Sequence, residues 1–178
     1  MPARLPPHKE GASDPGPAHR LAMCELAAGE EPRLSVSAVE LEREGPSYTV
    51  DTLSAIHASN PGVELTFILG ADIAGTLPTW REPERLLSLA GLAVASRNGS
   101  DRARVLDAVA SLAAPGGEGE RPRAAVRFLS MAPVDVSSSI VRERVRAGEP
   151  IDELVGEAVA RYIAEHGLYT TRSKDGNQ

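Results

Sequence analysis

Short apolar runs alternate along the chain with longer segments of helical periodicity. ELTFILG, residues 64–70, is bounded by turn residues, which indicates a strand covered on both faces in a parallel sheet. Short apolar runs at residues 92–96 and 124–129 also predict strands. In RLSVSAVEL, residues 33–41, apolar residues and serines alternate instead, and this pattern predicts a half-buried strand.

Segments in which apolar residues recur every three or four positions predict the helices. Ser47 or Thr49 can cap one of them, and Asn60-Pro61-Gly62 ends it. A serine likewise caps the helix that begins at residue 137. The expected helices cover residues 19–29, 50–59, 71–77, 82–90, 101–114, 137–147 and 152–165.

Strands that alternate with helices indicate an α/β domain with a mostly parallel sheet. Ligands of such domains bind at the carboxyl ends of the strands, so site residues are expected in strand-to-helix turns. A length of 178 residues fits a single domain. We expect that domain over residues 1–169, a loop over 115–123 and a disordered tail over 170–178.

Charge and composition narrow the function classes. The formal net charge of −6 argues against a nucleic-acid partner bound through backbone electrostatics, although a local anion site stays open. No apolar run approaches the length of about 18 residues that a membrane helix needs, and the start lacks the apolar region of a signal peptide. We therefore expect a cytoplasmic protein with no membrane partner. Cys24 is the only cysteine, so no disulfide forms within the chain.

Two segments carry side chains suited to phosphate. His8 and Lys9 follow two prolines, and an imidazole beside an ammonium suits a phosphate whose charge moves during a reaction. A solvated loop is the commoner use of such residues. Ser137 and Ser138 open a helix that carries Arg142 in its first turns, a combination suited to a triphosphate. A solvated basic face is the alternative.

Two further segments suit other parts of a nucleotide. Ser47, Tyr48 and Thr49 lie where a helix begins, so their hydroxyls and amides can hold an anion or can simply cap the helix. Asp72 follows a glycine at a strand end and can bind ribose hydroxyls. Trp80, the only tryptophan, can stack on a planar ring or pack against the domain.

Several common motifs are missing from the sequence. It contains no phosphate-binding loop with a lysine, no G-x-G-x-x-G and no His, Cys or carboxylate residues at metal-ligand spacing. We therefore expect no metal held by a protein ligand cluster. His166 lies near a helix end, where a C-cap role is expected rather than a triad with a serine.

Seven segments in order resemble bacterial nicotinate-nucleotide adenylyltransferases: PPHK, the H-R at 19 and 20, ELEREGPSYTVDTL, LGAD, LPTW, DVSSSIVRERV and ARYIAEHGLY. The resemblance covers the expected domain. It implies a Rossmann-like parallel sheet with helices on both faces. It also implies transfer of the adenylyl group of ATP to nicotinate mononucleotide, which gives deamido-NAD and pyrophosphate, with Mg²⁺ accompanying the ATP. Such a transfer needs positioning and charge stabilisation rather than a covalent intermediate.

The resemblance also assigns roles on the ATP side. Ser137, Ser138 and Arg142 would hold the ATP phosphates. His8 and Lys9 would contact phosphate near the reacting centre, and with Arg142 they are the expected catalytic residues.

On the pyridine side, the resemblance implies that Trp80 stacks on the nicotinate ring and that Asp72 binds ribose. Ser47, Tyr48 and Thr49 would bind the nicotinate carboxylate. An anion site at a helix start favours the acid over the amide form of the substrate.

The sequence departs from the family at its start. Members begin with a strand, a G-G-T-F-D-P turn and a helix carrying H-x-G-H, and this sequence contains neither motif. The sheet would then lack the family's first strand, first helix and second strand. Members commonly read V-P-A where this chain reads Met1-Pro2-Ala3, so we hypothesise that Met1 is an internal start. An in-frame stop close before Met1, with no G-G-T-F-D-P upstream, would refute this.

Two other functions remain open at this point. A sister enzyme such as pantetheine-phosphate adenylyltransferase is a near alternative, although GPSYT and LPTW favour the pyridine nucleotide. The chain could instead be a non-catalytic nucleotide-binding remnant, which would bind without turnover. The sequence leaves the oligomeric state, a homo-oligomer included, undetermined.

Overall fold

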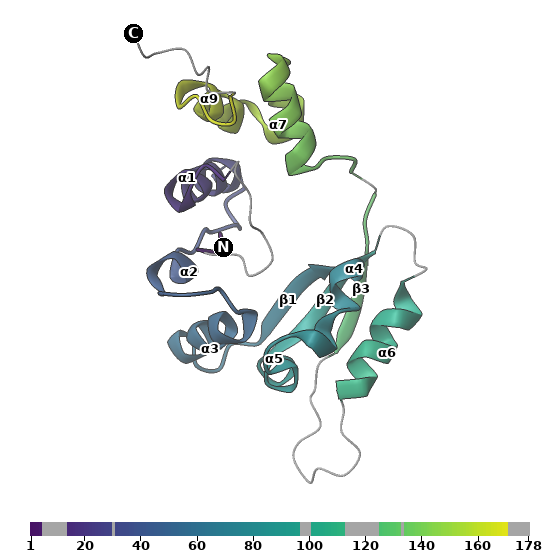
Figure 1. Ribbon diagram of the computed structural model, residues 1–178. Helices are drawn as coiled ribbons and strands as arrows, with labels where there is room; N and C mark the ends of the chain where they lie inside the picture. Colours follow the sequence, from purple (N-terminus) through teal and green to yellow (C-terminus); the bar gives the residue numbers. More distant parts are fainter. Residues whose placement is uncertain (5–13, 30, 97–100, 113–124, 133, 171–178) are drawn as a thin grey trace. The chain divides into compact units, whose positions relative to one another are not determined.

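The structure, a computed structural model, divides into two compact units (Figure 1). We call Ser47–Pro133 the sheet unit, and Met1–Pro46 together with Val134–Gln178 the helical unit. The single domain expected over residues 1–169 stays a prediction. The structure describes residues 1–4, 14–29, 31–96, 101–112, 125–132 and 134–170, so the expected loop 115–123 and nearly all of the expected tail lie outside it.

The sheet unit contains three parallel strands in the order β1-β2-β3. Phe67 pairs with Leu92 and Val94 pairs with Phe128, so these side chains lie on one face of the sheet. The strands match the three apolar runs of the sequence and confirm the α/β fold class. Their bounds are Leu65–Gly70 for β1, Ala90–Ser96 for β2 and Val126–Ser130 for β3.

Helices of the sheet unit cover that same face. Leu69, Leu92 and Val94 join buried side chains of the helices in one hydrophobic core, in which Leu77 and Leu86 are fully buried. The helices are α3 (Thr49–Ser59), α4 (Ala71–Ala74), the 3₁₀ helix η1 (Leu77–Thr79), α5 (Pro83–Leu89) and α6 (Arg102–Leu112).

The opposite face of β1 differs from the expectation of burial on both sides. Thr66 and Ile68 lie on that face, and Ile68 is 65% exposed. Within the sheet unit, the described core packs against one face of this strand alone. A run of apolar letters cannot separate a strand buried on one face from one buried on both.

The helical unit has its own core. Val141, Ile151, Val159, Ile163 and Leu168 are buried together, with side chains of α1 packed against them. The helices are α1 (Pro17–Ala28), α2 (Val39–Glu42), α7 (Ser138–Ala147), α8 (Asp152–Val155) and α9 (Glu157–Glu165).

Two predicted elements of the helical unit are wrong. Residues 33–41 form no strand: Leu34 is 61% exposed, and α2 begins at Val39. An isolated strand would leave its backbone groups unpaired, and every described strand belongs to the sheet unit. The helix expected over 152–165 is two helices, because Gly156 adopts the positive φ of +81° between them.

The predicted caps have different outcomes. Ser137 caps α7 as expected, because its side-chain oxygen accepts a hydrogen bond from the Ile140 amide at 3.2 Å. At α3 the expected cap is wrong: Tyr48 is the N-cap residue, its side chain makes no capping hydrogen bond, and Thr49 is already helical. Tyr48 is held by Arg81, whose guanidinium carbon lies 4.8 Å from the centre of the tyrosine ring.

A tyrosine hydroxyl links the first and last helices of the helical unit. Nδ1 of His19 on α1 lies 2.9 Å from Oη of Tyr162 on α9, in a partly buried hydrogen bond. We expect Tyr162→Phe to lower the free energy of unfolding by about 1 kcal/mol, the typical net value of one such bond. Urea denaturation measures the loss. If Tyr162→Phe lowers the free energy of unfolding equally in a protein that already carries His19→Ala, the hydrogen bond between the two side chains does not contribute to stability.

Candidate functional site

The predicted ATP-side residues gather where α7 begins. Ser137 precedes the helix, and Ser138 and Arg142 are four positions apart, which places both on one helix face. Nη2 of Arg142 donates to Oγ of Ser139 at 3.3 Å. The first amides of a helix have no backbone partner within it and carry partial positive charge, so hydroxyls, amides and a guanidinium all lie within the first turns of α7.

A pocket of about 270 Å³ opens beside this helix start. Ser137, Ser138 and Arg142 line its polar side, and Val155 and Ile163 line its apolar side. Tyr169 completes the wall from the end of the described chain. The pocket lies wholly within the helical unit. We call it the serine pocket.

The residues predicted for the pyridine side belong to the sheet unit. Ser47, Tyr48 and Thr49 lie at the start of α3 as expected. Arg81 is a neighbour that the sequence analysis missed: besides its contact with Tyr48, it lies 3.6 Å from a carboxylate oxygen of Asp51. Its position directly after Trp80 was the only signal in the sequence that could have pointed to it.

Trp80 ends the 3₁₀ helix η1 and is half-buried. Its Nε1 donates to Oγ1 of Thr76 at 3.0 Å, and Phe67 meets its ring edge-on with the centroids 6.2 Å apart. Trp80 thus packs against the core of the sheet unit, which is one of the two roles expected from the sequence. Stacking of its remaining surface on a ligand ring stays a prediction.

Asp72 lies in the first turn of α4, directly after β1, and is exposed. Its carboxylate folds back over Gly70: a Cβ built on Gly70 would lie 2.6 Å from Oδ1 of Asp72. Any larger residue at Gly70 would displace this carboxylate. The glycine therefore sets the position of Asp72 at the carboxyl end of β1. His8 and Lys9 lie outside the described residues.

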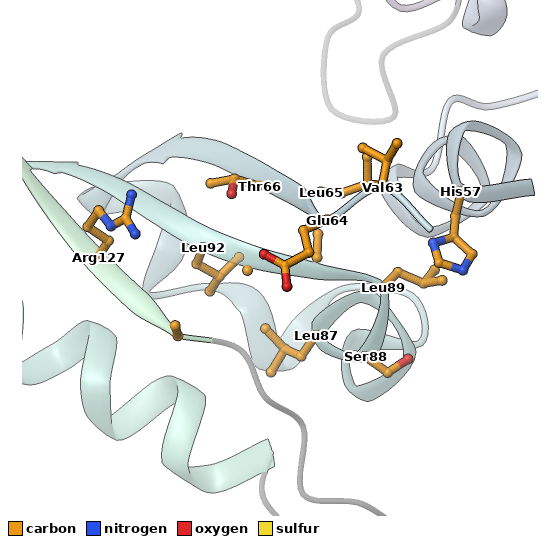
Figure 2. Close-up of a pocket in the computed structure, with 13 residues that line it drawn as sticks. His57, Val63, Glu64, Leu65, Thr66, Leu87, Ser88, Leu89, Leu92 and Arg127 are labelled. Carbon is orange, nitrogen blue, oxygen red and sulfur yellow. The ribbon is translucent and has the colours of Figure 1, made fainter. Parts of the chain in front are cut away.

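A larger pocket of about 430 Å³ lies at the opposite ends of the strands (Figure 2). Its lining includes Glu64 before β1, Ala90 at the start of β2 and Arg127 near the start of β3. Ligands of parallel α/β sheets bind at the carboxyl ends instead. We therefore do not assign the nucleotide site to this larger pocket.

The described residues bring no three His, Cys, Asp or Glu side chains together in a way that could hold a metal ion. Mg²⁺ commonly keeps water ligands and binds through substrate phosphates, which a site of hydroxyls, amides and a guanidinium can receive. In the part of the chain that the structure describes, no helix is long and apolar enough to span a membrane.

The chain is similar to solved structures of a eukaryotic nucleotidyltransferase. Two are of Plasmodium falciparum nicotinic acid mononucleotide adenylyltransferase, one complexed with NaAD and one with APC. The first has a TM-score of 0.65 at 18% identity over 93% of this chain and 78% of the other. The second has a TM-score of 0.63 at 18% identity over 89% and 78%. At this low identity the structural similarity bears on the fold alone. It confirms the Rossmann-like fold class.

Sequence relatives align over nearly the whole chain. A probable nicotinate-nucleotide adenylyltransferase of Symbiobacterium thermophilum is 39% identical over 99% of this chain and 82% of its own length. Nicotinate-nucleotide adenylyltransferase of Bacillus subtilis is 35% identical over 95% and 80%. The cytidylyltransferase-like family matches residues 3–144. By this match and these identities, the chain belongs to the cytidylyltransferase-like family and, within it, to the nicotinate-nucleotide adenylyltransferases.

Proposed function

We propose that this protein transfers the adenylyl group of ATP to nicotinate mononucleotide and forms deamido-NAD and pyrophosphate. The observation that carries the proposal is the alignment of nicotinate-nucleotide adenylyltransferases along nearly the entire chain. The cluster of Ser137, Ser138 and Arg142 at the start of α7 supports it from the structure. The same relatives favour this function over a pantetheine-phosphate enzyme and over a non-catalytic remnant.

The reaction requires positioning rather than a protein nucleophile. A phosphate oxygen of nicotinate mononucleotide attacks the α-phosphorus of ATP, and the bond from that phosphorus to the α,β-bridging oxygen breaks. Pyrophosphate leaves with the electron pair and the added negative charge. In our proposal, Arg142 and the amides at the start of α7 stabilise this charge, because a guanidinium and a helix start both favour anions.

The pyridine nucleotide is proposed to bind on the sheet unit. Asp72 accepts hydrogen bonds from ribose hydroxyls, and Trp80 stacks on the nicotinate ring. The amides and hydroxyls at residues 47–49 donate to the nicotinate carboxylate. The half-exposed ring of Trp80 and the exposed carboxylate of Asp72 are compatible with these roles.

The proposal also includes a metal ion, two residues near the N-terminus and a compartment. ATP would be bound as its Mg²⁺ complex, in which the ion would shield the phosphate charge. His8 and Lys9 contact phosphate near the reacting centre. ATP is abundant in the cytoplasm, so we propose the reaction for that compartment.

Pyrophosphate release by the purified protein with ATP, Mg²⁺ and nicotinate mononucleotide tests the proposal. Deamido-NAD should appear in equal amount by chromatography, and omission of either nucleotide should abolish both products. Binding of both nucleotides without turnover would instead identify a binding module. Turnover with pantetheine phosphate alone would identify the sister enzyme.

We expect nicotinamide mononucleotide to be a poorer substrate than nicotinate mononucleotide by at least about tenfold in kcat/KM. A hydrogen bond to a charged group is worth about 1.5–3 kcal/mol, against about 1 kcal/mol for a neutral one. The neutral carboxamide of nicotinamide mononucleotide therefore gains less binding free energy from the hydrogen-bond donors at the start of α3. Steady-state rates with both substrates measure the ratio, and comparable rates would contradict a carboxylate site at residues 47–49.

A further inference from the structure

Tyr169 follows a helix ending that fixes its position. The amide of Gly167 donates to the carbonyl of Ala164, and the amide of Leu168 donates to the carbonyl of Ile163. These two bonds form a Schellman motif, and the buried Leu168 packs in one core with Ile163. The chain is therefore anchored one residue before Tyr169.

The backbone of Tyr169 is in an unusual conformation. Its φ is +64°, and only one other described non-glycine residue, Glu82, has a positive φ. A left-handed conformation costs a residue with a Cβ about 1–2 kcal/mol. Such strain commonly occurs where a side chain must be held in one place for function.

This conformation places the tyrosine in the wall of the serine pocket. Tyr169 is half-buried there, with Ser137, Ser138 and Arg142 in the same wall. Its ring packs against the core of the helical unit. No described residue forms a hydrogen bond with its hydroxyl, so that donor is available to a ligand.

A tyrosine hydroxyl is protonated at neutral pH, and the surroundings of Tyr169 do not change that. Burial raises the pKa of the Tyr169 phenol above its ordinary value, and Asp14 raises it further. The positive charges of Arg142 and Arg20 act in the opposite direction and leave the pKa raised. At neutral pH the group is thus a neutral donor in a region that also holds a cation, which suits a polyanion.

We propose that Tyr169 is a further ATP-binding residue, whose hydroxyl donates a hydrogen bond to the triphosphate that Ser137, Ser138 and Arg142 hold. This inference rests on the proposed function, because it takes the serine pocket as the ATP-phosphate site. It extends that site to the last turn of the described chain. The strained backbone and the Schellman motif then serve to place one hydroxyl.

Equilibrium binding of α,β-methylene-ATP to Tyr169→Phe tests the inference. The variant keeps the ring and its packing and removes only the hydroxyl. We expect the dissociation constant to rise about tenfold, as for the loss of one hydrogen bond to a charged group. Tm should stay at the wild-type value, and KM for nicotinate mononucleotide should not change.

Tyr162→Phe is the matched control, since it removes the hydroxyl of another half-buried tyrosine of the same unit. It should lower stability and leave the affinity for the ATP analogue at the wild-type value. Wild-type affinity in Tyr169→Phe, or an equal loss of affinity in both variants, would overturn the role of Tyr169. A wild-type protein that fails to bind the analogue would also overturn it.

The same experiment separates this inference from the proposed function. If the wild type binds the analogue tightly and Tyr169→Phe binds it weakly, the role of Tyr169 stands even without adenylyl transfer. If adenylyl transfer occurs and Tyr169→Phe binds the analogue like the wild type, the proposed function stands and the role of Tyr169 fails.

Discussion

Substitution of Arg142 by alanine is expected to lower kcat/KM for ATP by about 100- to 1,000-fold, which corresponds to about 2.7–4 kcal/mol of transition-state stabilisation. Arg142 is the only charged side chain among the described residues that line the serine pocket. Its guanidinium can bind two phosphate oxygens at once, and the negative charge on the leaving pyrophosphate grows as the reaction proceeds. KM for nicotinate mononucleotide should change by less than about threefold, because Arg142 is expected to contact the phosphates of ATP and not the pyridine nucleotide.

Arg146 provides the matched control for this charge change. It lies one turn further along α7 and is exposed, about 6 Å further from the helix start. Arg146→Ala should keep near-normal kinetics. Arg142→Lys should restore only part of the activity, because an ammonium cannot form the planar two-point contact. Equal effects of Arg142→Ala and Arg146→Ala would contradict a specific role for Arg142.

The second large effect is expected for Trp80→Ala, which should raise KM for nicotinate mononucleotide about 30-fold. Stacking of an aromatic side chain on a heterocyclic base is worth about 1–3 kcal/mol, which corresponds to about 5- to 150-fold in affinity. KM for ATP should change far less. Steady-state kinetics with each substrate varied in turn measure the two constants.

Loss of packing must be separated from loss of stacking in this variant. Trp80 also packs against Phe67 and donates to Thr76, so Trp80→Ala should reduce Tm. Phe67→Leu disturbs the same part of the core and leaves the tryptophan in place. It should reduce Tm without a selective rise in KM for nicotinate mononucleotide. Equal rises of KM for both substrates in Trp80→Ala would contradict the stacking role.

Much of the sheet unit was predictable from local patterns. In β1, β2 and β3 the residues of one face, such as Leu69, Leu92 and Val94, pack in a core, and such burial leaves a direct trace in the sequence. Ser137 was predictable as a cap because its bond reaches only three residues along the chain. The cluster of Ser138 with Arg142 follows from helical periodicity alone. These features depend on near neighbours in sequence.

Features that depend on distant partners were not predictable in this way. The alternation in residues 33–41 suits a strand, but a strand exists only where a neighbour offers hydrogen bonds, and the helical unit offers none among its described residues. Arg81 reaches Tyr48 across more than thirty positions of the chain. Tyr169 joins Arg142 in one pocket only after α9 and its Schellman motif have turned the chain. The sequence by itself determined the periodic elements, the helix start that holds the serines and the family of the chain. The tertiary structure alone decided which distant side chains share a pocket, because contacts between remote residues leave no periodic signal.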